Sequence, residues 1–165
     1  MKPLTQSEKI HLSTTEIAKL IRQQLKKEYP KFKFSITSKY YSMGSSITIS
    51  LMESPIKVIK DYKDLSELAL LHTERNNYTK EQIEHMQKEK YHQLNQYILR
   101  HEYNPDTWNN GVFLTKEGHK VMQRAVKISD QYNFDESDSM TDYYFVNFSL
   151  HIQVGKWNKD YRVIP

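Results

Sequence analysis

A strict alternation of apolar and polar residues near the end of the chain constrains the fold more than any other feature. Every second position from 148 to 154 is apolar, and hydrogen-bonding side chains lie between them; the apolar set is Phe148, Leu150, Ile152 and Val154, and the polar set is Asn147, Ser149, His151 and Gln153. A period of two over this length is typical of a half-buried β-strand. We therefore expect residues 143–154 to form a strand with one face in the core.

Two earlier segments repeat this alternation and predict a β-hairpin. Residues 32–37 and 46–51 place apolar side chains at alternate positions, namely Phe32, Phe34 and Ile36 in the first segment and Ile47, Ile49 and Leu51 in the second. The turn is expected at 42–45, where Gly44 can take the positive φ angle that a tight turn often needs. Pro55 is expected to close the second strand or to lie just beyond it.

The first helix is predicted by a capping box. Ser13 supplies a hydroxyl at the cap and Glu16 a carboxylate three residues later, and apolar residues then recur at helical spacing. We expect this helix to run from about residue 14 to residue 28, because Pro30 cannot continue it. The preceding residues 1–12 are polar and are expected to be flexible.

Residues 56–112 are expected to be mainly helical, with breaks. A short helix at 64–71 is predicted with Asp64 as its cap, and a longer one is predicted to begin at Thr79 and to end before Asn104. Residues 56–60 are apolar but too few to distinguish a strand from a helix. Thr115 is expected to cap the last helix.

These elements predict an α+β fold. Their order is α-β-β-α-α-α-β, and we expect a small, mostly antiparallel sheet of three to four strands that about four helices cover on its apolar face. The chain has 165 residues, a length typical of one domain, so we expect a single domain over residues 1–165.

Composition excludes several classes of function. The chain has no cysteine, which rules out disulfides, thiolate metal ligands and thiol catalysis. No apolar run approaches the length of a membrane span, and the N-terminal residues form no signal peptide. We expect a soluble protein of the host-cell cytoplasm. The formal net charge of +4 permits contact with nucleic acid without arguing strongly for it.

The polar face of the predicted sheet is the first candidate binding surface. Alternation places one set of side chains on it: Lys31, Lys33, Ser35, Thr37 and Lys39 from the first strand, Thr48 and Ser50 from the second, and Asn147, Ser149, His151 and Gln153 from the third. Sheets that bind nucleic acid usually stack bases on central aromatic residues. Here the aromatic residues of the strands point to the apolar side, which weakens that interpretation. The alternative is an ordinary solvated face.

An acidic loop before the last strand is the second candidate. Four carboxylates lie within eight residues: Asp135, Glu136, Asp138 and Asp142. Their spacing does not fit an EF-hand loop, and the neighbouring Ser and Thr residues favour an irregular loop held by local hydrogen bonds. A Mg²⁺ or Ca²⁺ site and an acidic partner-binding patch are the alternatives. With no metal favoured here, we expect no cofactor.

Two further sets of residues contain groups that could bind a metal or transfer a proton. His85, Glu89 and His92 share one face of the predicted long helix, but that face should lie in water and offers no further ligand for zinc. An acid–base site from Asp142, Tyr143, Tyr144 and His151 lacks a nucleophile–base–orienter set. We therefore expect no enzymatic activity and name no catalytic residue.

Aromatic residues in or near loops are the remaining candidates. They are Tyr40, Tyr41, Trp108, Trp157 and Tyr161. Exposed Trp and Tyr anchors suit protein recognition, and the alternative is that these rings cap the ends of the core.

Three blocks of sequence carry a resemblance to a known family. The first is Thr14-Thr15-Glu16-Ile17-Ala18-Lys19-Leu20-Ile21-Arg22, followed by the predicted hairpin with Gly44-Ser45-Ser46-Ile47; the second is Leu114-Thr115-Lys116-Glu117-Gly118; the third is the acidic stretch 135–143, followed by Asn147-Phe148 and Gly155-Lys156-Trp157. Together they resemble the large polyvalent-protein-associated domains of phages and conjugative elements, of which this chain looks like a free-standing member. The resemblance implies an accessory module of mobile DNA that helps the element to establish itself, and it implies no catalytic residue.

These observations lead to a prediction of function. We expect a non-enzymatic accessory protein of a phage or plasmid that binds and inhibits a host defence protein or ribonucleoprotein complex, by occlusion of the kind known from anti-CRISPR proteins. The alternative is a nucleic-acid-binding accessory protein of a mobile element. The residues expected to contact the partner are Arg22, Lys26, Lys31, Lys33, Lys39, Tyr41, Asp135, Glu136, Asp138, Asp142, His151 and Trp157.

Overall fold

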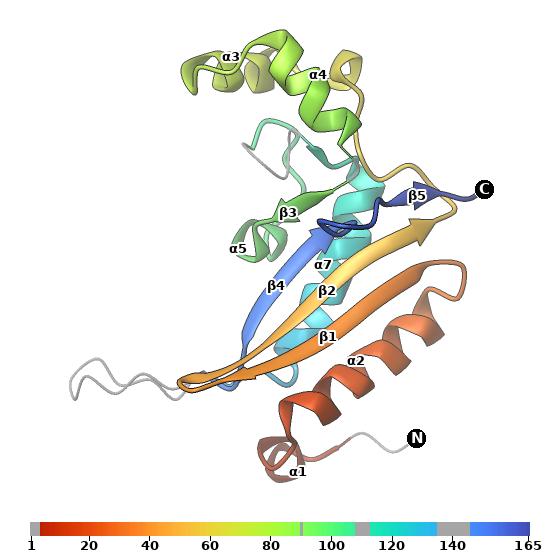
Figure 1. Cartoon of the computed structure of the whole chain (residues 1–165), viewed down its shortest axis with the longest axis vertical. Helices are drawn as coiled ribbons and strands as arrows, with labels where there is room; N and C mark the ends of the chain where they lie inside the picture. Colours follow the sequence, from red (N-terminus) through yellow and green to blue (C-terminus); the bar gives the residue numbers. More distant parts are fainter. Residues whose placement is uncertain (1–3, 90, 108–112, 135–145) are drawn as a thin grey trace, which may run out of the picture.

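The fold is an α+β arrangement of one mixed sheet and several helices, which confirms the predicted class. The structure is a computed structural model and describes residues 4–89, 91–107, 113–134 and 146–165. Figure 1 labels the elements, which are, in chain order, α1 (Gln6–Ile10), α2 (Thr14–Glu28), β1 (Lys33–Tyr41), β2 (Gly44–Ser54), a 3-10 turn (Tyr62–Asp64), α3 (Glu67–Arg75), α4 (Lys80–Lys88), β3 (His92–Leu94), α5 (Gln96–Leu99), α7 (Lys116–Asp130), β4 (Ser149–Val154) and β5 (Arg162–Val163).

The sheet has the order β1-β2-β4-β3, and β5 pairs with β2 beyond the end of β4. The hairpin β1–β2 is antiparallel, as is the pairing of β3 with β4. In contrast, β4 runs parallel to β2, with Thr48 opposite His151, and β5 is also parallel to β2. The alternating strand predicted near the C-terminus is therefore an interior strand with neighbours on both sides.

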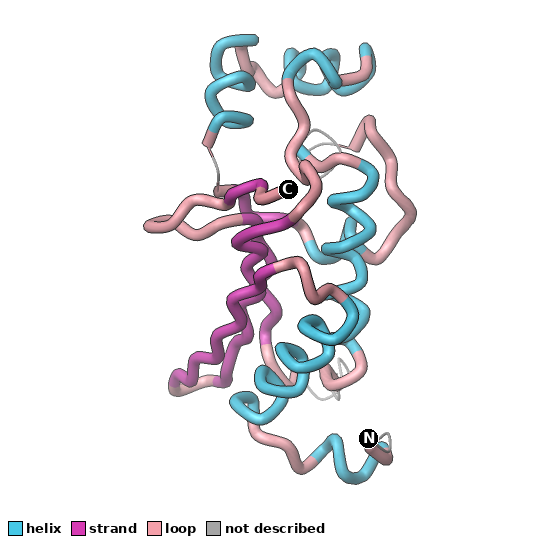
Figure 2. Tube along the Cα trace, turned by 90° about the vertical axis from the view of Figure 1, so that its right-hand side faces the viewer, coloured by secondary structure: helices cyan, strands magenta, loops and turns pink. Residues whose placement is uncertain are grey.

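The predicted alternation of the strands is confirmed by burial. The side chains of Phe148, Leu150, Ile152 and Val154 are buried together with Ile47, Ile49 and Leu51 of β2. Figure 2 shows the strands on one side of the molecule and the long helices α2 and α7 on the other. These two helices contribute the rest of the core through Ile17, Ile21, Leu25, Met122, Ala125 and Val126.

Helix α2 follows the edge strand β1 and protects it. It begins with the predicted capping box, in which the Ser13 hydroxyl accepts from the backbone N–H of Glu16, and it ends before Pro30. The guanidinium of Arg22 donates to the carbonyl oxygen of Ile36 at 2.5 Å. An edge strand offers unpaired backbone groups to other chains, and this bond occupies one of them.

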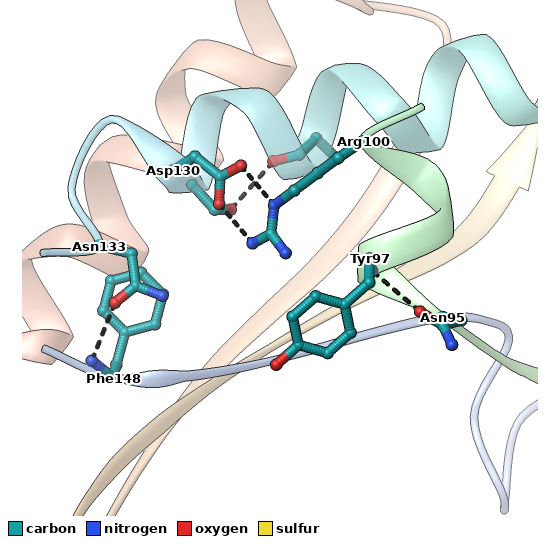
Figure 3. Close-up of polar contacts among 8 residues, drawn as sticks. Asn95, Tyr97, Arg100, Asp130, Asn133 and Phe148 are labelled. Atoms are coloured by element: carbon teal, nitrogen blue, oxygen red, sulfur yellow. Dashed lines mark hydrogen bonds and ion pairs between the residues drawn. The ribbon is translucent and has the colours of Figure 1, made fainter. Parts of the chain in front are cut away.

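Polar contacts fix α5, α7 and the start of β4 relative to one another (Figure 3). Arg100 at the end of α5 donates from Nε and Nη2 to the Asp130 carboxylate at the end of α7, at 2.9 and 2.8 Å. The Asn95 Oδ1 accepts from the Tyr97 N–H at 2.9 Å and begins α5. The Asn133 Oδ1 accepts from the backbone N–H of Phe148 at 3.3 Å, so the loop after α7 also orients β4.

The prediction of one long helix from Thr79 to before Asn104 is wrong. Helix α4 ends at Lys88, and the short strand β3 and helix α5 follow it. The apolar residues after Lys88 had suggested a helical period, but Leu94 pairs with Ile152 of β4 instead. Pairing with the sheet edge overrides the local propensity in this segment.

Three smaller differences have local causes. The residue Asp64 ends a 3-10 turn, and the Ser66 hydroxyl instead accepts from the Ala69 N–H at the start of α3. Within residues 1–12, a capping box of Thr5 and Glu8 starts the short helix α1. The undecided segment 56–60 is extended at Ile59, which forms an isolated antiparallel bridge with Leu114.

Helices α3 and α4 lie beyond the end of the sheet, at the top of Figure 1. They share a small apolar cluster in which Ala69 and Phe113 are buried against Leu65 and Met86. None of the helices in the described ranges has the length and apolar character needed to cross a membrane.

Two buried histidines should make the stability of the protein depend on pH. Burial lowers the pKa of His92, and the Glu89 backbone and carboxylate raise it by smaller amounts. Burial also lowers the pKa of His119, whose Nε2 lies 3.0 Å from the His101 carbonyl oxygen. The unfolded chain binds protons at these sites below about pH 6.5, before the folded protein does. The protein should therefore be fully stable above that pH and lose stability as the pH falls toward the folded pKa values.

The variant His92→Phe tests this directly, because the ring stacks on Phe113 at a centroid distance of 4.6 Å and phenylalanine can keep that contact. Urea unfolding at about pH 7.5 and about pH 5.5 should show wild type losing more stability than the variant. Any packing cost of the substitution is the same at both pH values and cancels. An equal loss in both proteins would contradict the prediction.

Candidate functional site

The sheet has one face opposite α2 and α7 (Figure 2), and we call it the open face. Polar side chains line it in transverse rows. The strand registers place its members across from one another: Lys39, Ser46 and Ser149 in one row, Thr37, Thr48 and His151 in the next, and Ser35, Ser50, Gln153 and Gln93 in the third. The sequence predicted most of this surface from alternation alone. It presents hydroxyl, amide, imidazole and ammonium groups side by side, whereas Ser46 and Ser50 within the rows are buried.

Hydrogen bonds hold one end of the open face in a single arrangement. The Gln93 amide donates to the Tyr91 hydroxyl at 3.1 Å, and that hydroxyl donates to Gln153 Oε1 at 3.4 Å. The Gln153 amide nitrogen in turn donates to the Ser50 hydroxyl at 2.9 Å. Because each group is positioned by the next one, this part of the surface is ordered before any partner arrives.

The tip of the β1–β2 hairpin presents apolar surface beside the open face. The Tyr41 hydroxyl donates to the Ser45 carbonyl oxygen at 3.0 Å, and Gly44 takes the positive φ angle predicted for the turn. Tyr40 is held on the helix side, where its hydroxyl accepts from the Thr15 N–H at 3.2 Å and where the hydrogen bonds of Thr15 lower its pKa. Met43 stands at the tip with 92% of its surface exposed.

Charged groups lie at the opposite end of β1 from the tip. Arg162 of β5 donates to the Glu53 carboxylate at 2.5 Å, and Lys33 lies 3.6 Å from the same carboxylate. Arg162 first, and Lys33 to a smaller extent, lower the pKa of Glu53. Lys31 and Lys39 are exposed and form no ion pair with any residue that the structure describes.

The cations predicted to contact a partner lie on two sides of β1. Lys33 and Lys39 lie on the open face, whereas Arg22 and Lys26 lie on α2, on the helix side of the sheet. Arg22 is engaged with the carbonyl oxygen of Ile36, so part of its role is structural. The two groups therefore border the edge strand rather than forming a single patch.

The predicted aromatic anchors have different environments. Trp157 follows β4, is 88% exposed, and shares the lining of a hollow of about 550 Å³ with Tyr91 and Gln93 of the open face. Tyr161 is buried, and its hydroxyl bonds Ser54 Oγ at 2.7 Å, so it caps the core. Trp108 lies outside the described residues.

The predicted acidic loop also lies outside the described residues, so the structure says nothing of Asp135, Glu136, Asp138 and Asp142, or of Tyr143 and Tyr144. In the described ranges, no three His, Cys, Asp or Glu side chains are arranged to hold a metal ion.

The prediction that His85, Glu89 and His92 share one solvent-exposed face of a helix is wrong. His85 and Glu89 form an exposed pair at 3.4 Å, whereas His92 is buried on β3 because the helix has already ended.

Sequence reasoning missed several residues that shape this surface. Tyr91 and Gln93 were assigned to a helix, and Glu53 and Arg162 meet only because β5 returns to pair with β2. The segment 91–94 is too short to show an alternating period, and a two-residue strand carries no recognisable signal. Only the pairing partners in the folded chain reveal these positions.

Comparison with known proteins places the chain in a family. No curated protein and no solved structure matches it significantly. The family model of large polyvalent protein associated domain 29 matches residues 12–117, a span of 106 among the 165 residues that reaches from the start of α2 to the first turn of α7. The match includes the first block of the resemblance and most of the second. Because it covers well over half of the chain, the protein belongs to the family of large polyvalent protein associated domain 29.

Proposed function

We propose that this protein is a non-enzymatic accessory protein of a phage or other mobile element that binds a host defence complex and blocks it by occlusion. Family membership associates the chain with phages and mobile elements. The observation that carries the proposal is the open face itself, an ordered polar surface with strongly exposed apolar side chains, Met43 and Trp157, at its two ends.

The chemistry of this surface favours a protein partner. Protein interfaces combine a few aromatic or Met anchors with a surrounding field of hydrogen-bonding groups. Trp157 and Met43 supply the first, and the Ser, Thr and Gln rows supply the second. Since the Gln93–Tyr91–Gln153–Ser50 bonds already order the surface, binding costs less conformational entropy than on a loose face.

The second candidate function is binding of nucleic acid, and the cations along β1 favour it. Lys26, Lys31 and Lys39 are exposed and take part in no ion pair with described residues, and Arg22 lies between the helix and the strand edge. Such cations can contact backbone phosphates, and binding of that kind weakens steeply as salt rises. Among the residues that the structure describes, none at the centre of the open face is an aromatic on which bases could stack, so we rank this function second.

Affinity capture from a lysate of the host, with and without nuclease, tests the proposal. We expect a discrete host protein to be retained after nuclease treatment and at raised salt, and its recovery to fall at least about tenfold with the double variant Met43→Ser and Trp157→Ala. The matched control is Tyr97→Ala, which removes another exposed ring, on the short helix α5 that the Arg100–Asp130 pair ties to α7.

Two outcomes would count against the proposal. Recovery of many nucleic-acid-associated proteins that disappear with nuclease would favour the second function, and Lys31→Glu with Lys39→Glu should then abolish it. Retention of the same protein partner by the double variant would show that the open face is not the binding surface. Melting curves of all variants establish that they fold.

A further inference from the structure

The hollow beside Trp157 is lined mainly by aromatic side chains, and we call it the Trp157 hollow. Its volume of about 550 Å³ is in the range of roughly 300–1,000 Å³ that is common for binding sites. The aromatic members of its lining come from segments that are far apart in the chain: Tyr78, Tyr91, His92, Phe113 and Trp157. Because the face of an aromatic ring carries partial negative charge, such a lining attracts cations.

The inner part of this lining is held in one arrangement. The rings of His92 and Phe113 are buried and stack on each other at a centroid distance of 4.6 Å. The Tyr91 hydroxyl donates to Gln153 Oε1 on the neighbouring strand, which fixes the end of that side chain. A ligand would therefore meet rings that are already in place, and binding would cost little conformational entropy.

The outer member, Trp157, leaves its ring accessible on a backbone that is itself held. It lies in a tight turn in which the Lys156 N–H donates to the Lys159 carbonyl oxygen at 2.8 Å and the Lys159 N–H donates back at 3.1 Å. Neither lysine lines the hollow. With 88% of its surface exposed, the indole of Trp157 is free to stack on a group of a partner.

One carboxylate gives the hollow its charge. Among the described residues that line it, Glu89 is the only acid, and none is a lysine or an arginine. The side chain of Glu89 is 56% exposed, so a ligand can reach it. Its neighbour at 3.4 Å is Nδ1 of His85, an imidazole that is a cation only when protonated. Aromatic faces beside an accessible carboxylate favour a ligand with a positive charge.

We propose that the Trp157 hollow binds an arginine side chain of the protein partner, with its guanidinium stacked on the aromatic rings and paired with the Glu89 carboxylate. A guanidinium is planar, always charged and more weakly hydrated than an ammonium, so it combines stacking with carboxylate binding better than lysine does. This inference rests on the proposed function, because it assumes a protein partner, and it specifies which partner residue the Trp157 anchor contacts.

NMR titration of the full chain with Nα-acetyl-arginine amide, at constant ionic strength, tests the site. The chain has two tryptophans, and loss of one indole N–H signal in Trp157→Ala assigns the signal of Trp157. We expect blocked arginine to shift this signal with a dissociation constant in the millimolar range. Blocked citrulline, which has nearly the same shape without the charge, should bind at least about tenfold more weakly.

Variants separate the carboxylate from charge in general. Glu89→Gln should weaken the binding of blocked arginine at least about threefold. Glu74→Gln, which removes an exposed carboxylate on α3, is the matched control and should leave the binding unchanged. No shift at about 100 mM blocked arginine, equal binding of citrulline or of blocked lysine, or equal binding by Glu89→Gln and wild type would each overturn the proposal.

The capture experiment distinguishes failure of this inference from failure of the proposed function. A host protein that is captured by wild type and lost with Met43→Ser and Trp157→Ala, together with no binding of blocked arginine, would overturn the arginine site alone. Binding of blocked arginine that depends on Glu89, together with capture of no discrete partner, would support the site and overturn the occlusion of a host complex.

Discussion

The variant Phe148→Ala is expected to lower the free energy of unfolding by about 3–5 kcal/mol. Phe148 is 1% exposed, and it is among the largest fully buried side chains of the core. It lies at the start of β4, where its backbone N–H donates to Asn133 Oδ1. Removing the ring takes away its buried apolar area and leaves a cavity in a closely packed core.

Urea unfolding of the wild type and variant measures this loss as a shift of the midpoint at unchanged slope. Trp157→Ala is the matched control, since it truncates a still larger ring that is almost fully exposed, and its effect should stay within about 0.5 kcal/mol. A loss below about 1 kcal/mol for Phe148→Ala would mean that β4 is not held in the core as described.

Replacing Gly118 with alanine should destabilise the protein by about 1–3 kcal/mol. In most helices the same change is stabilising, by about 0.5–1 kcal/mol, because alanine has less freedom to lose on folding. Here a Cβ at Gly118 would lie 2.6 Å from the Val58 carbonyl oxygen and 2.8 Å from the Val58 Cβ. The first turn of α7 packs directly on the backbone of the segment after β2, which a rotamer change cannot move aside.

The sign of the effect is what distinguishes this packing from ordinary helix propensity. Thermal and urea unfolding should both show a loss of stability for Gly118→Ala, whereas Lys120→Ala, at an exposed position of the same helix, should change stability by less than about 0.5 kcal/mol. An unchanged or raised melting temperature for Gly118→Ala would contradict the close approach of α7 to Val58. The glycine of the Leu114-Thr115-Lys116-Glu117-Gly118 block thus has a physical reason in this chain.

Local sequence signals predicted the elements whose cause is local. The Ser13–Glu16 capping box and Pro30 placed α2 at the residues where it begins and ends. Alternation assigned the two faces of β1, β2 and β4 correctly, and so it placed Lys33, Lys39 and His151 on one surface. Alternation is the same for parallel and antiparallel neighbours, however, and the parallel pairing of β4 with β2 was not predictable from it.

The rest of the fold depends on contacts between distant segments. Residues after Lys88 have apolar spacing compatible with a helix, and only the free edge of β4 makes Leu94 part of a strand. The Trp157 hollow combines residues from α4, the edge strand β3 and the turn after β4. No spacing within the sequence brings Met86, Phe113 and Trp157 together, because the pairing that joins β3 to β4 arises only in the folded sheet.

The interior position of β4 also affects how the chain reaches its fold during synthesis. Ser50 and Gln153, which bond each other across β2 and β4, are 103 residues apart, so β2 leaves the ribosome long before its neighbour. Until then the hairpin carries an unpaired edge and an uncovered apolar face, which are the features that make nascent chains aggregate. Non-local pairing of this kind slows folding. The nascent hairpin is therefore the segment for which a chaperone, or rapid docking of α2 onto its apolar face, matters most.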